Sequence, residues 1–384
     1  MTGRLLAVVV GTRPEAVKMA PVIVALRACP WARVLVVATG QHQEMALRPL
    51  AGFGIVPDII LDAMSPGQSL ADLTARLMAG LDGVIAAHRP DAVLAQGDTT
   101  SVLAAGMVAF YRQIPFAHVE AGLRTDDIAH PFPEEFNRRA AALVAARHFA
   151  PTPLAERNLL RENVSPERIV LTGNTGIDAL YATLGTLEDI SPERVPRTIL
   201  LTAHRRENLG APLVEIFSAA RAVADAFDDV EIVCPLHPNP AVQGLAAQRL
   251  GGHPRIQVRA HAEYREMVRL LASSHLVLTD SGGLQEEAPA LGKPVLVLRD
   301  VTERPEAVAV GAARCVGTRA DDIVRETARL LTDREAYEQM ATPVSPYGDG
   351  NAALRIVQAL GELLYGSVPA GTPVPPSWRP AVAA

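Results

Sequence analysis

The sequence predicts an α/β protein with two Rossmann-like, doubly wound domains. Short apolar runs rich in β-branched residues alternate with longer helical patterns along the chain, and this alternation is typical of parallel sheets with helices on both faces. The chain has 384 residues, of which 49% are hydrophobic, so it can form two separate cores. We therefore expect two parallel sheets, one after the other.

The first domain is predicted over residues 1–172. A strand-like run at residues 169–171 ends in a Gly-Asn turn, after which a new helix begins, so the junction is expected near residues 172–178. The strands expected before the junction are residues 5–10, 34–39, 59–61, 92–95, 116–119 and 148–150.

The second domain is predicted over residues 173–350. Its expected strands are residues 198–201, 230–233, 256–258, 276–278, 295–298 and 314–316. A last helix, residues 351–365, is expected to complete the first domain. Five prolines follow Gly366, which predicts that residues 366–384 form an extended or disordered tail rather than a packed one.

Composition excludes several classes of protein. The net charge is −6 and no dense Lys/Arg tract is present, which argues against a nucleic acid or an anionic membrane as partner. The first ten residues are typical of a strand rather than a signal peptide, and no apolar run has the length of a membrane span. Cys29, Cys234 and Cys315 are widely spaced and fit neither a disulfide framework nor a metal site. We expect reduced thiols and a cytoplasmic location.

The Asp280-Ser-Gly-Gly motif lies between a predicted strand and a helix. Ser281 and the two glycines can bring backbone N–H groups to the helix N-terminus, where unpaired donors and the helix dipole favour a phosphate. Glu286 or Glu287, one turn later, could accept hydrogen bonds from ribose hydroxyls. The alternative is an ordinary helix start with Ser281 as N-cap.

The loop after the first predicted strand is also polar. Gly11 allows close approach of the backbone, and Pro14 suits the first turn of a helix. Arg13 and Lys18 stand near that helix N-terminus, where cations oppose the helix dipole. We therefore expect an anionic ligand there, the alternative being a solvated helix face.

Three further loops of the first half carry carboxylates. Asp98, Glu120 and Glu134 could converge at one edge of the first domain, because the carboxyl ends of parallel strands share an edge. Carboxylates held close together repel one another, so at least one should have a raised pKa and serve as proton donor or acceptor near neutral pH. Structural alternatives exist: Asp98 as a helix cap and Glu134 as a first-turn acid. Glu120 could simply pair with Arg124.

His204 follows a predicted strand in the second half and precedes a helix. Its imidazole titrates near neutral pH, which makes it a candidate acid/base group or phosphate ligand, and Arg205 and Arg206 are its neighbours. His237 marks a second polar strand end. A metal site is not expected, because the chain lacks a His-x-x-x-His pair and EF-hand spacing.

Taken in order, these motifs resemble one family closely, the non-hydrolysing UDP-N-acetylglucosamine 2-epimerases. The resemblance covers nearly the whole chain except the proline-rich tail. The motifs that carry it are Gly11-Thr-Arg-Pro-Glu, Thr39-Gly-Gln-His, Gly97-Asp-Thr-Thr, His118-Val-Glu-Ala-Gly-Leu-Arg, Pro131-Phe-Pro-Glu-Glu, Thr172-Gly-Asn-Thr, His204-Arg-Arg-Glu-Asn, Asp280-Ser-Gly-Gly and Thr302-Glu-Arg-Pro-Glu. The resemblance implies a glycosyltransferase-B-type pair of domains facing a cleft, with UDP held mainly by the second domain.

The resemblance also implies a reaction, the reversible conversion of UDP-N-acetylglucosamine to UDP-N-acetylmannosamine. Because C2 is not adjacent to a carbonyl, direct deprotonation there is too slow. The family instead eliminates UDP to give a 2-acetamidoglucal and adds UDP back. No metal or other cofactor is expected, since proton transfer and departure of the leaving group suffice. The expected partners are a nucleotide sugar and a second copy of the chain.

Site residues are carried over from the family motifs by position. Asp98, Glu120 and Glu134 are the implied acid/base groups, and His204 assists at the diphosphate. The implied substrate-binding residues are Arg13, Lys18, Ser281, Gly282, Gly283, Glu287 and Arg304.

One departure from the family pattern concerns regulation. Many bacterial members bind a second UDP-N-acetylglucosamine as an activator, through a Gln-His-x-Gln motif and an arginine before a later glutamine. This chain keeps Gln41, but Glu44 replaces the second amide and Gly67 occupies the place of the arginine. Both changes disfavour an anion. We therefore expect no activation by substrate.

Other activities fit part of this pattern. A glycosyltransferase of the same fold would share the nucleotide site, and an epimerase for a UDP-diacetamido uronic acid would share the core. A hydrolysing epimerase and a non-catalytic nucleotide-sugar sensor are further alternatives. The motifs alone leave the sugar substituents open.

Overall fold

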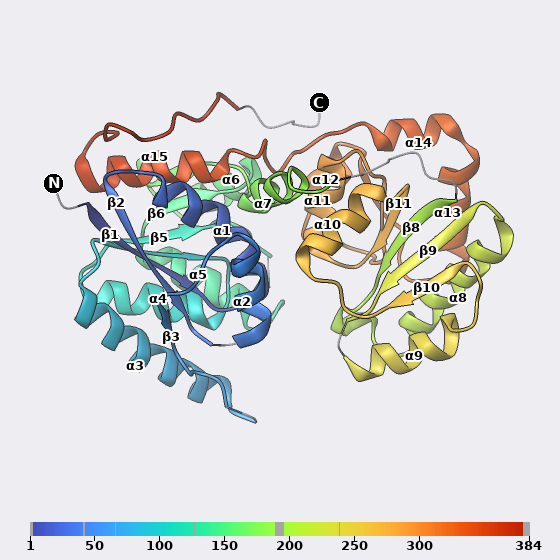
Figure 1. Cartoon of the computed structure of the whole chain (residues 1–384), viewed down its shortest axis with the longest axis horizontal. Helices are drawn as coiled ribbons and strands as arrows, with labels where there is room; N and C mark the ends of the chain where they lie inside the picture. The colour runs from blue at the N-terminus through green and yellow to red at the C-terminus, as the bar shows by residue number, and fades with distance from the viewer. Residues whose placement is uncertain are drawn as a thin grey trace. The chain divides into compact units, whose positions relative to one another are not determined.

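The computed structural model describes residues 3–40, 43–65, 67–125, 127–188, 196–237 and 239–378, without the side chains of residues 43–47 and 206. The chain divides into two compact units. The first unit comprises Met1–Ala179 and Tyr347–Pro380, and the second comprises Leu180–Pro346. Each unit is a parallel sheet with helices around it (Figure 1), so the predicted α/β, doubly wound class is confirmed.

The first unit contains a seven-stranded sheet in the order β3-β2-β1-β4-β5-β6-β7. Its strands are β1 (Arg4–Val10), β2 (Ala32–Ala38), β3 (Ile59–Ile60), β4 (Ala92–Gln96), β5 (Phe116–Val119), β6 (Ala145–Ala150) and β7 (Ile169–Leu171). β1 pairs in parallel with both β2 and β4. The strand order therefore reverses between β1 and β4, where ligands of open α/β sheets commonly bind.

The helices of the first unit connect these strands. They are α1 (Arg13–Arg27), α2 (Gln43–Gly52), α3 (Leu70–His88), α4 (Thr100–Tyr111), α5 (Glu134–Val144), α6 (Pro153–Arg161), α7 (Thr175–Leu184, which runs on into the second unit) and α15 (Ala352–Tyr365). The central strands are nearly continuous apolar runs, because helices cover both faces of the sheet. Val8 and Leu94, for instance, are fully buried.

Helix α15 joins the first unit from the far end of the chain. Its Ile356 and Leu360 lie in one core cluster with Ile23 and Leu26 of α1. Asp178 of α7 caps α15, because its carboxylate accepts hydrogen bonds from the N–H groups of Ala353 (2.7 Å) and Ala352 (3.2 Å). Burial raises the pKa of Asp178 to about 6.

The tail after α15 corrects one expectation. Its backbone over the described part is extended after a turn, as predicted, but it packs against the first unit. Trp31 donates a hydrogen bond from its indole N–H to Thr372 (2.8 Å). Arg355 donates to the carbonyl of Pro376 (3.0 Å) and lies 5.1 Å from the ring centre of Trp378. The proline content signalled an extended backbone but did not reveal these polar and aromatic anchors.

The second unit contains a six-stranded parallel sheet in the order β10-β9-β8-β11-β12-β13. Its strands are β8 (Arg197–Thr202), β9 (Val230–Pro235), β10 (Ile256–Arg259), β11 (Leu276–Thr279), β12 (Val295–Val297) and β13 (Ala313–Cys315). Its helices are α8 (Ala211–Ala226), α9 (Pro240–Leu250), α10 (Tyr264–Ser273), α11 (Gly282–Ala290), α12 (Pro305–Ala309), α13 (Ala320–Thr332) and α14 (Arg334–Ala341).

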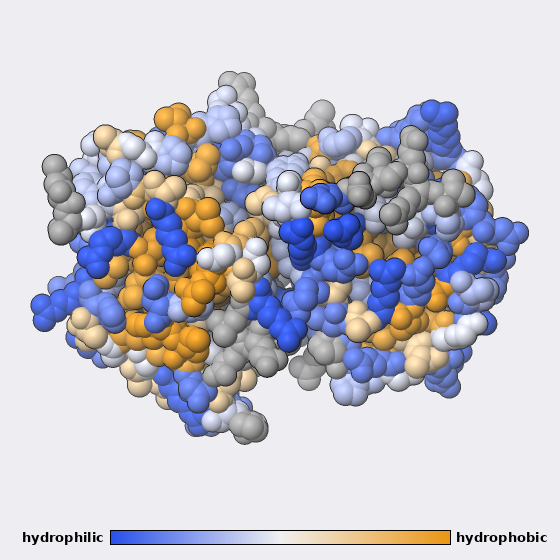
Figure 2. Space-filling view, viewed as in Figure 1, coloured by the Kyte–Doolittle hydropathy of each residue, from blue (hydrophilic) through white to orange (hydrophobic). Residues whose placement is uncertain are grey.

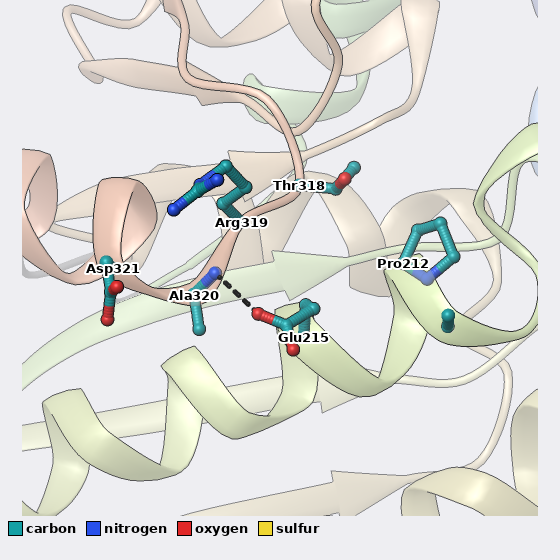
Figure 3. Close-up of a pocket in the computed structure, with 7 residues that line it drawn as sticks. Pro212, Glu215, Thr318, Arg319, Ala320 and Asp321 are labelled. Atoms are coloured by element: carbon teal, nitrogen blue, oxygen red, sulfur yellow. Dashed lines mark hydrogen bonds between the residues drawn. The ribbon is translucent and has the colours of Figure 1, made fainter.

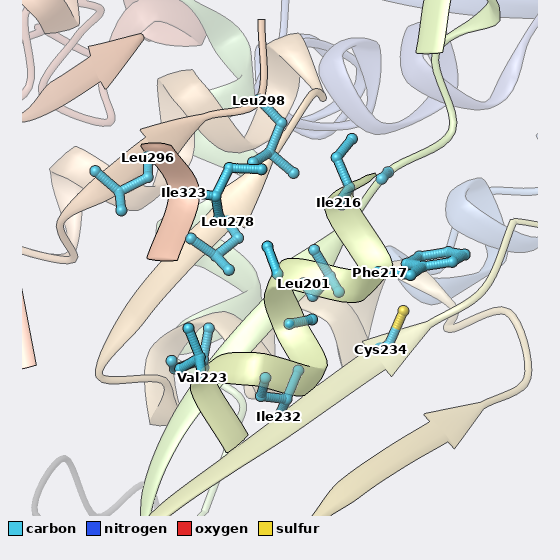
Figure 4. Packing of buried hydrophobic residues seen from close by; sticks show 14 of the residues in the cluster. Leu201, Ile216, Phe217, Val223, Ile232, Cys234, Leu278, Leu296, Leu298 and Ile323 are labelled. Atoms are coloured by element: carbon cyan, nitrogen blue, oxygen red, sulfur yellow. The ribbon is translucent and has the colours of Figure 1, made fainter. Parts of the chain in front are cut away.

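The core of this unit forms where α8 covers the sheet. Ile216 and Phe217 of α8 pack with Leu201, Leu278 and other buried strand residues (Figure 4). The sulfur of Cys234 lies in the same cluster, where burial raises the pKa of its thiol to about 12. All three cysteines carry free thiols.

The surface carries both hydrophilic and hydrophobic residues. The hydrophobic residues gather in patches on the visible face of the first unit (Figure 2). Phe110 and Tyr111 of α4 and Leu143 of α5 are exposed. Among the described helices, none is long and apolar enough to span a bilayer.

Candidate active site

Glu120 occupies the end of β5 in the first unit. Gln96, the last residue of β4, lies opposite Val119 in the sheet, and its side-chain N–H donates to Glu120 Oε2 (2.8 Å). Lys18 of α1 donates to the same oxygen from 2.6 Å. The backbone of Glu120 is left-handed, with φ of 61°, which is uncommon for a residue with a side chain. Two donors and an unusual backbone conformation therefore fix this carboxylate.

Asp98 follows β4, the strand next to β5, and is held by helix α5. Arg138 donates to Asp98 Oδ2 (2.6 Å), and Asn137 donates to the Asp98 carbonyl (2.9 Å). Glu134 is the first residue of α5 and is half-buried. The structure thus places Asp98 and Glu120 at adjacent strand ends and ties the helix that begins with Glu134 to Asp98.

Two of the structural alternatives for these carboxylates are wrong. The N-cap of α4 is Thr99, whose side chain accepts a hydrogen bond from Val102 N, so Asp98 does not cap this helix. Arg124 pairs with Glu162 (2.6 Å) rather than with Glu120. Glu134 does lie in the first turn of α5, as its alternative stated.

Glu15, which sequence reasoning did not single out, is the carboxyl with a raised pKa at this edge. It is buried, and its Oε2 accepts hydrogen bonds from the N–H groups of Gly11 and Thr12, the latter at 2.9 Å. Burial is the main cause that raises its pKa to about 7, and the charge of Asp98 is a minor one. The N–H groups of Gly11 and Thr12 are thus taken by the chain's own carboxylate.

In the second unit, the loops after β8 and β11 are joined by one buried carboxylate. Thr202 and Thr279 end these strands as register partners, and their hydroxyls are 2.6 Å apart. Asp280 is fully buried, and its Oδ2 accepts hydrogen bonds from the N–H groups of His204 and Arg205, both at 2.8 Å. The side chain of Asn208 donates to the same oxygen (2.9 Å).

The N-terminus of α11 lies beside two guanidinium groups. A Cβ placed on Gly282 would be 3.4 Å from Arg205 Nη2 and 3.8 Å from Arg304 Nη2. The N-cap, Ser281, makes no side-chain capping hydrogen bond. A helix N-terminus with two cations and no side chain over the first glycine suits a diphosphate. Sequence reasoning had named Gly282 and Arg304 for substrate, whereas Arg205 was noted only as a neighbour of His204.

The two adjacent acids of α11 have different surroundings. Glu286 pairs with Arg304. Glu287 is 9% exposed and accepts a hydrogen bond from the Tyr264 hydroxyl (3.1 Å). Burial, together with the charge of Glu287, raises the pKa of Tyr264 well above its usual value, so this tyrosine stays a hydrogen-bond donor. Sequence reasoning missed Tyr264, since a hydroxyl 23 positions away gives no local signal.

The side chain of His204 is partly exposed, with 32% of it accessible. Its ring stacks on His237, the polar strand end predicted after β9, with centres 5.1 Å apart and planes 4° from parallel. The two loops named for histidines are therefore neighbours in space.

The residues of the expected activator site are described only in part. Gln41 lies outside the described residues, and Glu44 belongs to α2 without a described side chain. Gly67 is described, with φ of 70° and open space where a Cβ would stand.

A pocket of about 450 Å³ lies elsewhere on the second unit, between the first turns of α8 and α13 (Figure 3). Glu215 Oε2 accepts a hydrogen bond there from Ala320 N (3.0 Å). The residues around this pocket are Ala211, Pro212, Glu215, Thr318, Arg319, Ala320 and Asp321. None of the predicted site residues is among them.

Comparison with known proteins defines the class. The sequence profile of the family described as UDP-N-acetylglucosamine 2-epimerase matches residues 24–361. The UDP-N-acetylglucosamine 2-epimerase of Escherichia coli O157:H7 is 47% identical over 92% of this chain and 97% of its own length.

Solved structures agree with this class. A protein from Listeria monocytogenes is 46% identical, with a TM-score of 0.90 over 96% of this chain and 98% of its own. UDP-GlcNAc 2-epimerase from Neisseria meningitidis, solved bound to UDP-GlcNAc, is 42% identical, with a TM-score of 0.86 over 93% of this chain and 99% of its own. The chain belongs to the UDP-N-acetylglucosamine 2-epimerase family.

Proposed function

We propose that this chain converts UDP-N-acetylglucosamine to UDP-N-acetylmannosamine and back by inverting C2. Family membership supports the substrate. The observation that carries the proposal is the pair of carboxylates at adjacent strand ends, Asp98 and Glu120, each of which is held by a cation within 2.6 Å.

The chemistry follows from these groups. One carboxylate of the first unit removes the C2 proton, the electron pair forms the C1–C2 double bond, and the C1–O bond breaks so that UDP leaves. A second acid/base group delivers a proton to the opposite face of C2 when UDP adds back. Inversion thus needs two acid/base positions and stabilisation of a departing diphosphate.

We assign the acid/base role to the first unit and the hold on UDP mainly to the second. Asp98, Glu120 and Glu134 are the acid/base candidates, with Lys18 orienting Glu120. Arg13 is assigned to the departing phosphate charge, and His204 acts at the diphosphate. The UDP-binding and sugar-binding candidates are Ser281, Gly282, Gly283, Glu287 and Arg304.

Proton NMR in deuterated water tests the proposal. Pure UDP-N-acetylglucosamine should give UDP-N-acetylmannosamine and acquire deuterium at C2 in both epimers. Release of free N-acetylmannosamine would instead indicate a hydrolysing epimerase. No exchange with this sugar, but exchange with a UDP-diacetamido uronic acid, would identify the related epimerase.

We further propose that turnover needs no activating second nucleotide sugar. Glu44 is an acid and Gly67 has no side chain, and by the family resemblance both stand where an activator's phosphates would need donors. A reaction started with pure UDP-N-acetylmannosamine should proceed without a lag and follow a hyperbolic rate curve. A lag that added UDP-N-acetylglucosamine abolishes would contradict this.

We also infer a homodimer in the cytoplasm. Phe110 and Tyr111 on α4 and Leu143 on α5 are exposed, and these two helices pack together. Exposed apolar surface favours association. The three free thiols fit a reducing compartment. Light scattering should give twice the chain mass, and Leu143→Glu should lower it. A wild-type monomer would exclude the dimer, and fractionation of cells tests the location.

A further inference from the structure

The fully buried Asp280 turns one oxygen toward the ring of His204. Its Oδ2 is occupied by the three donors of the 204–208 loop. Its Oδ1 is buried and has no hydrogen-bond partner among the described residues. The nearest cationic or titratable nitrogen that the structure records is His204 Nδ1, at 3.5 Å. A buried oxygen of an ionisable group without a donor is costly, which makes a role toward the imidazole the best account of Oδ1.

We propose that Asp280 is the positioning residue of His204: its Oδ1 receives Nδ1–H, fixes the ring, and stabilises the imidazolium form. The separation of 3.5 Å is slightly longer than a hydrogen bond, and such contacts often shorten when ligand binds. The second ring nitrogen, Nε2, lies on the opposite side of the ring from Asp280 and is then the group offered to the diphosphate.

This proposal rests on the epimerase reaction and adds a role within it. When the C1–O bond breaks, its electron pair leaves with UDP, and the diphosphate gains a negative charge. An imidazolium donates a charge-assisted hydrogen bond to that oxygen, whereas a neutral imidazole with its proton on Nδ1 would meet it with a lone pair. Asp280 therefore makes His204 a hydrogen-bond donor to the diphosphate when UDP leaves.

Other groups near the ring bear on its charge. His237 stacks against it in parallel and opposes a second positive charge. Arg205, from the same loop, also disfavours the imidazolium, although Glu303 lies 3.8 Å from its guanidinium. Asp280 is the carboxylate that directly faces the ring, so the charge of His204 depends on it more than on the other neighbours.

Asp280→Asn tests the role, with Asn208→Ala as the matched control. Both variants remove or weaken a contact that anchors the 204–208 loop, but only Asp280→Asn changes the group that faces Nδ1. In Asp280→Asn, we expect kcat to fall about tenfold or more with little change in KM. We also expect the high-pH limit of kcat to move down by about one unit or more, since an opposite charge at this distance shifts titration by that amount. Asn208→Ala should keep the high-pH limit of kcat at its wild-type position.

Equal changes of the pH limit in both variants would show that Asp280 only anchors the loop. A measurement on the wild-type protein decides the matter even if Asp280→Asn misfolds. With ¹⁵N-labelled histidine, and His204→Gln to assign the signal, Nδ1 should carry the proton in neutral His204. A proton on Nε2 instead would overturn the proposal. This readout does not require turnover, so it separates failure of the pairing from failure of the epimerase function.

Discussion

Two helices of this molecule, α1 and α11, begin directly after a buried parallel strand, yet their N-termini differ. At α1, the chain's own Glu15 accepts the amides of Gly11 and Thr12. At α11, Gly282 opens the helix beside the guanidinium groups of Arg205 and Arg304. In the first unit, two amides of this βα turn are therefore taken by a carboxylate of the chain, whereas in the second unit the first glycine of the helix lies beside two guanidinium groups. We infer that the two units divide the work into proton transfer and hold on UDP.

Substitution of the acid/base groups alone should produce the largest effect. Asp98→Asn and Glu120→Gln should each lower kcat by about 10²–10⁴-fold, because an amide of nearly the same volume cannot transfer the proton. UDP affinity measured by calorimetry should stay within about threefold of wild type. Asp82→Asn, in an exposed ion pair with Arg112, is the matched control. More than a tenth of wild-type activity in both site variants would refute their roles.

Glu15, which accepts the amides before α1, should make the stability of the protein depend on pH. The pKa of Glu15 is raised from 4.5 to about 7 by burial, so the folded protein binds this proton more tightly than the unfolded chain does. The stabilisation is complete below about pH 4.5 and is lost as the pH rises to about 7.

Glu15→Gln should remove this dependence. Urea unfolding at pH 5 and pH 8 should show that wild type loses about 2–3 kcal/mol relative to the variant over that interval. As a control, substitution of the exposed Glu362 (Glu362→Gln) should leave the unfolding free energy equal to that of wild type at both pH 5 and pH 8. If the difference in unfolding free energy between wild type and Glu15→Gln were the same at pH 5 and pH 8, Glu15 would ionise in the folded protein much as it does in the unfolded chain.

The cationic N-terminus of α11 should govern nucleotide affinity. Glu287→Ala should weaken UDP binding by about ten- to hundredfold, since hydrogen bonds to a charged group contribute about 1.5–3 kcal/mol. Exposed Glu338→Gln should leave calorimetric affinity unchanged. If Glu287→Ala binds UDP as wild type does, while Asp98→Asn or Glu120→Gln loses affinity, then the first unit rather than the second holds UDP.

The sequence predicted the sheets well, because apolar runs and turn residues are local signals. The thirteen strands among the described residues overlap the predicted runs, and only their ends differ. β6, for example, begins at Ala145, three residues early, because α5 passes into it without a turn residue that would mark the boundary.

The sequence did not predict the contacts in the site between residues that are far apart along the chain. Lys18 and Glu120, which pair at 2.6 Å, are 102 positions apart, and Tyr264 reaches Glu287 from another helix. Motifs identify which loops carry polar groups, but pairing depends on sheet order and on side-chain direction. For the same reason, neither Glu15 nor Asp280 could be assigned a role before the fold was known.

The capping of α15 by Asp178 has a consequence for synthesis. The amides of Ala352 and Ala353 lie 174 and 175 positions after the carboxylate that receives them. The first unit therefore remains without Ile356 and Leu360 in its core until the second unit, Leu180–Pro346, has been synthesised. The second unit is an uninterrupted segment, and domains generally fold as units while the chain grows. The half of the protein that is made first is thus the half that is finished last.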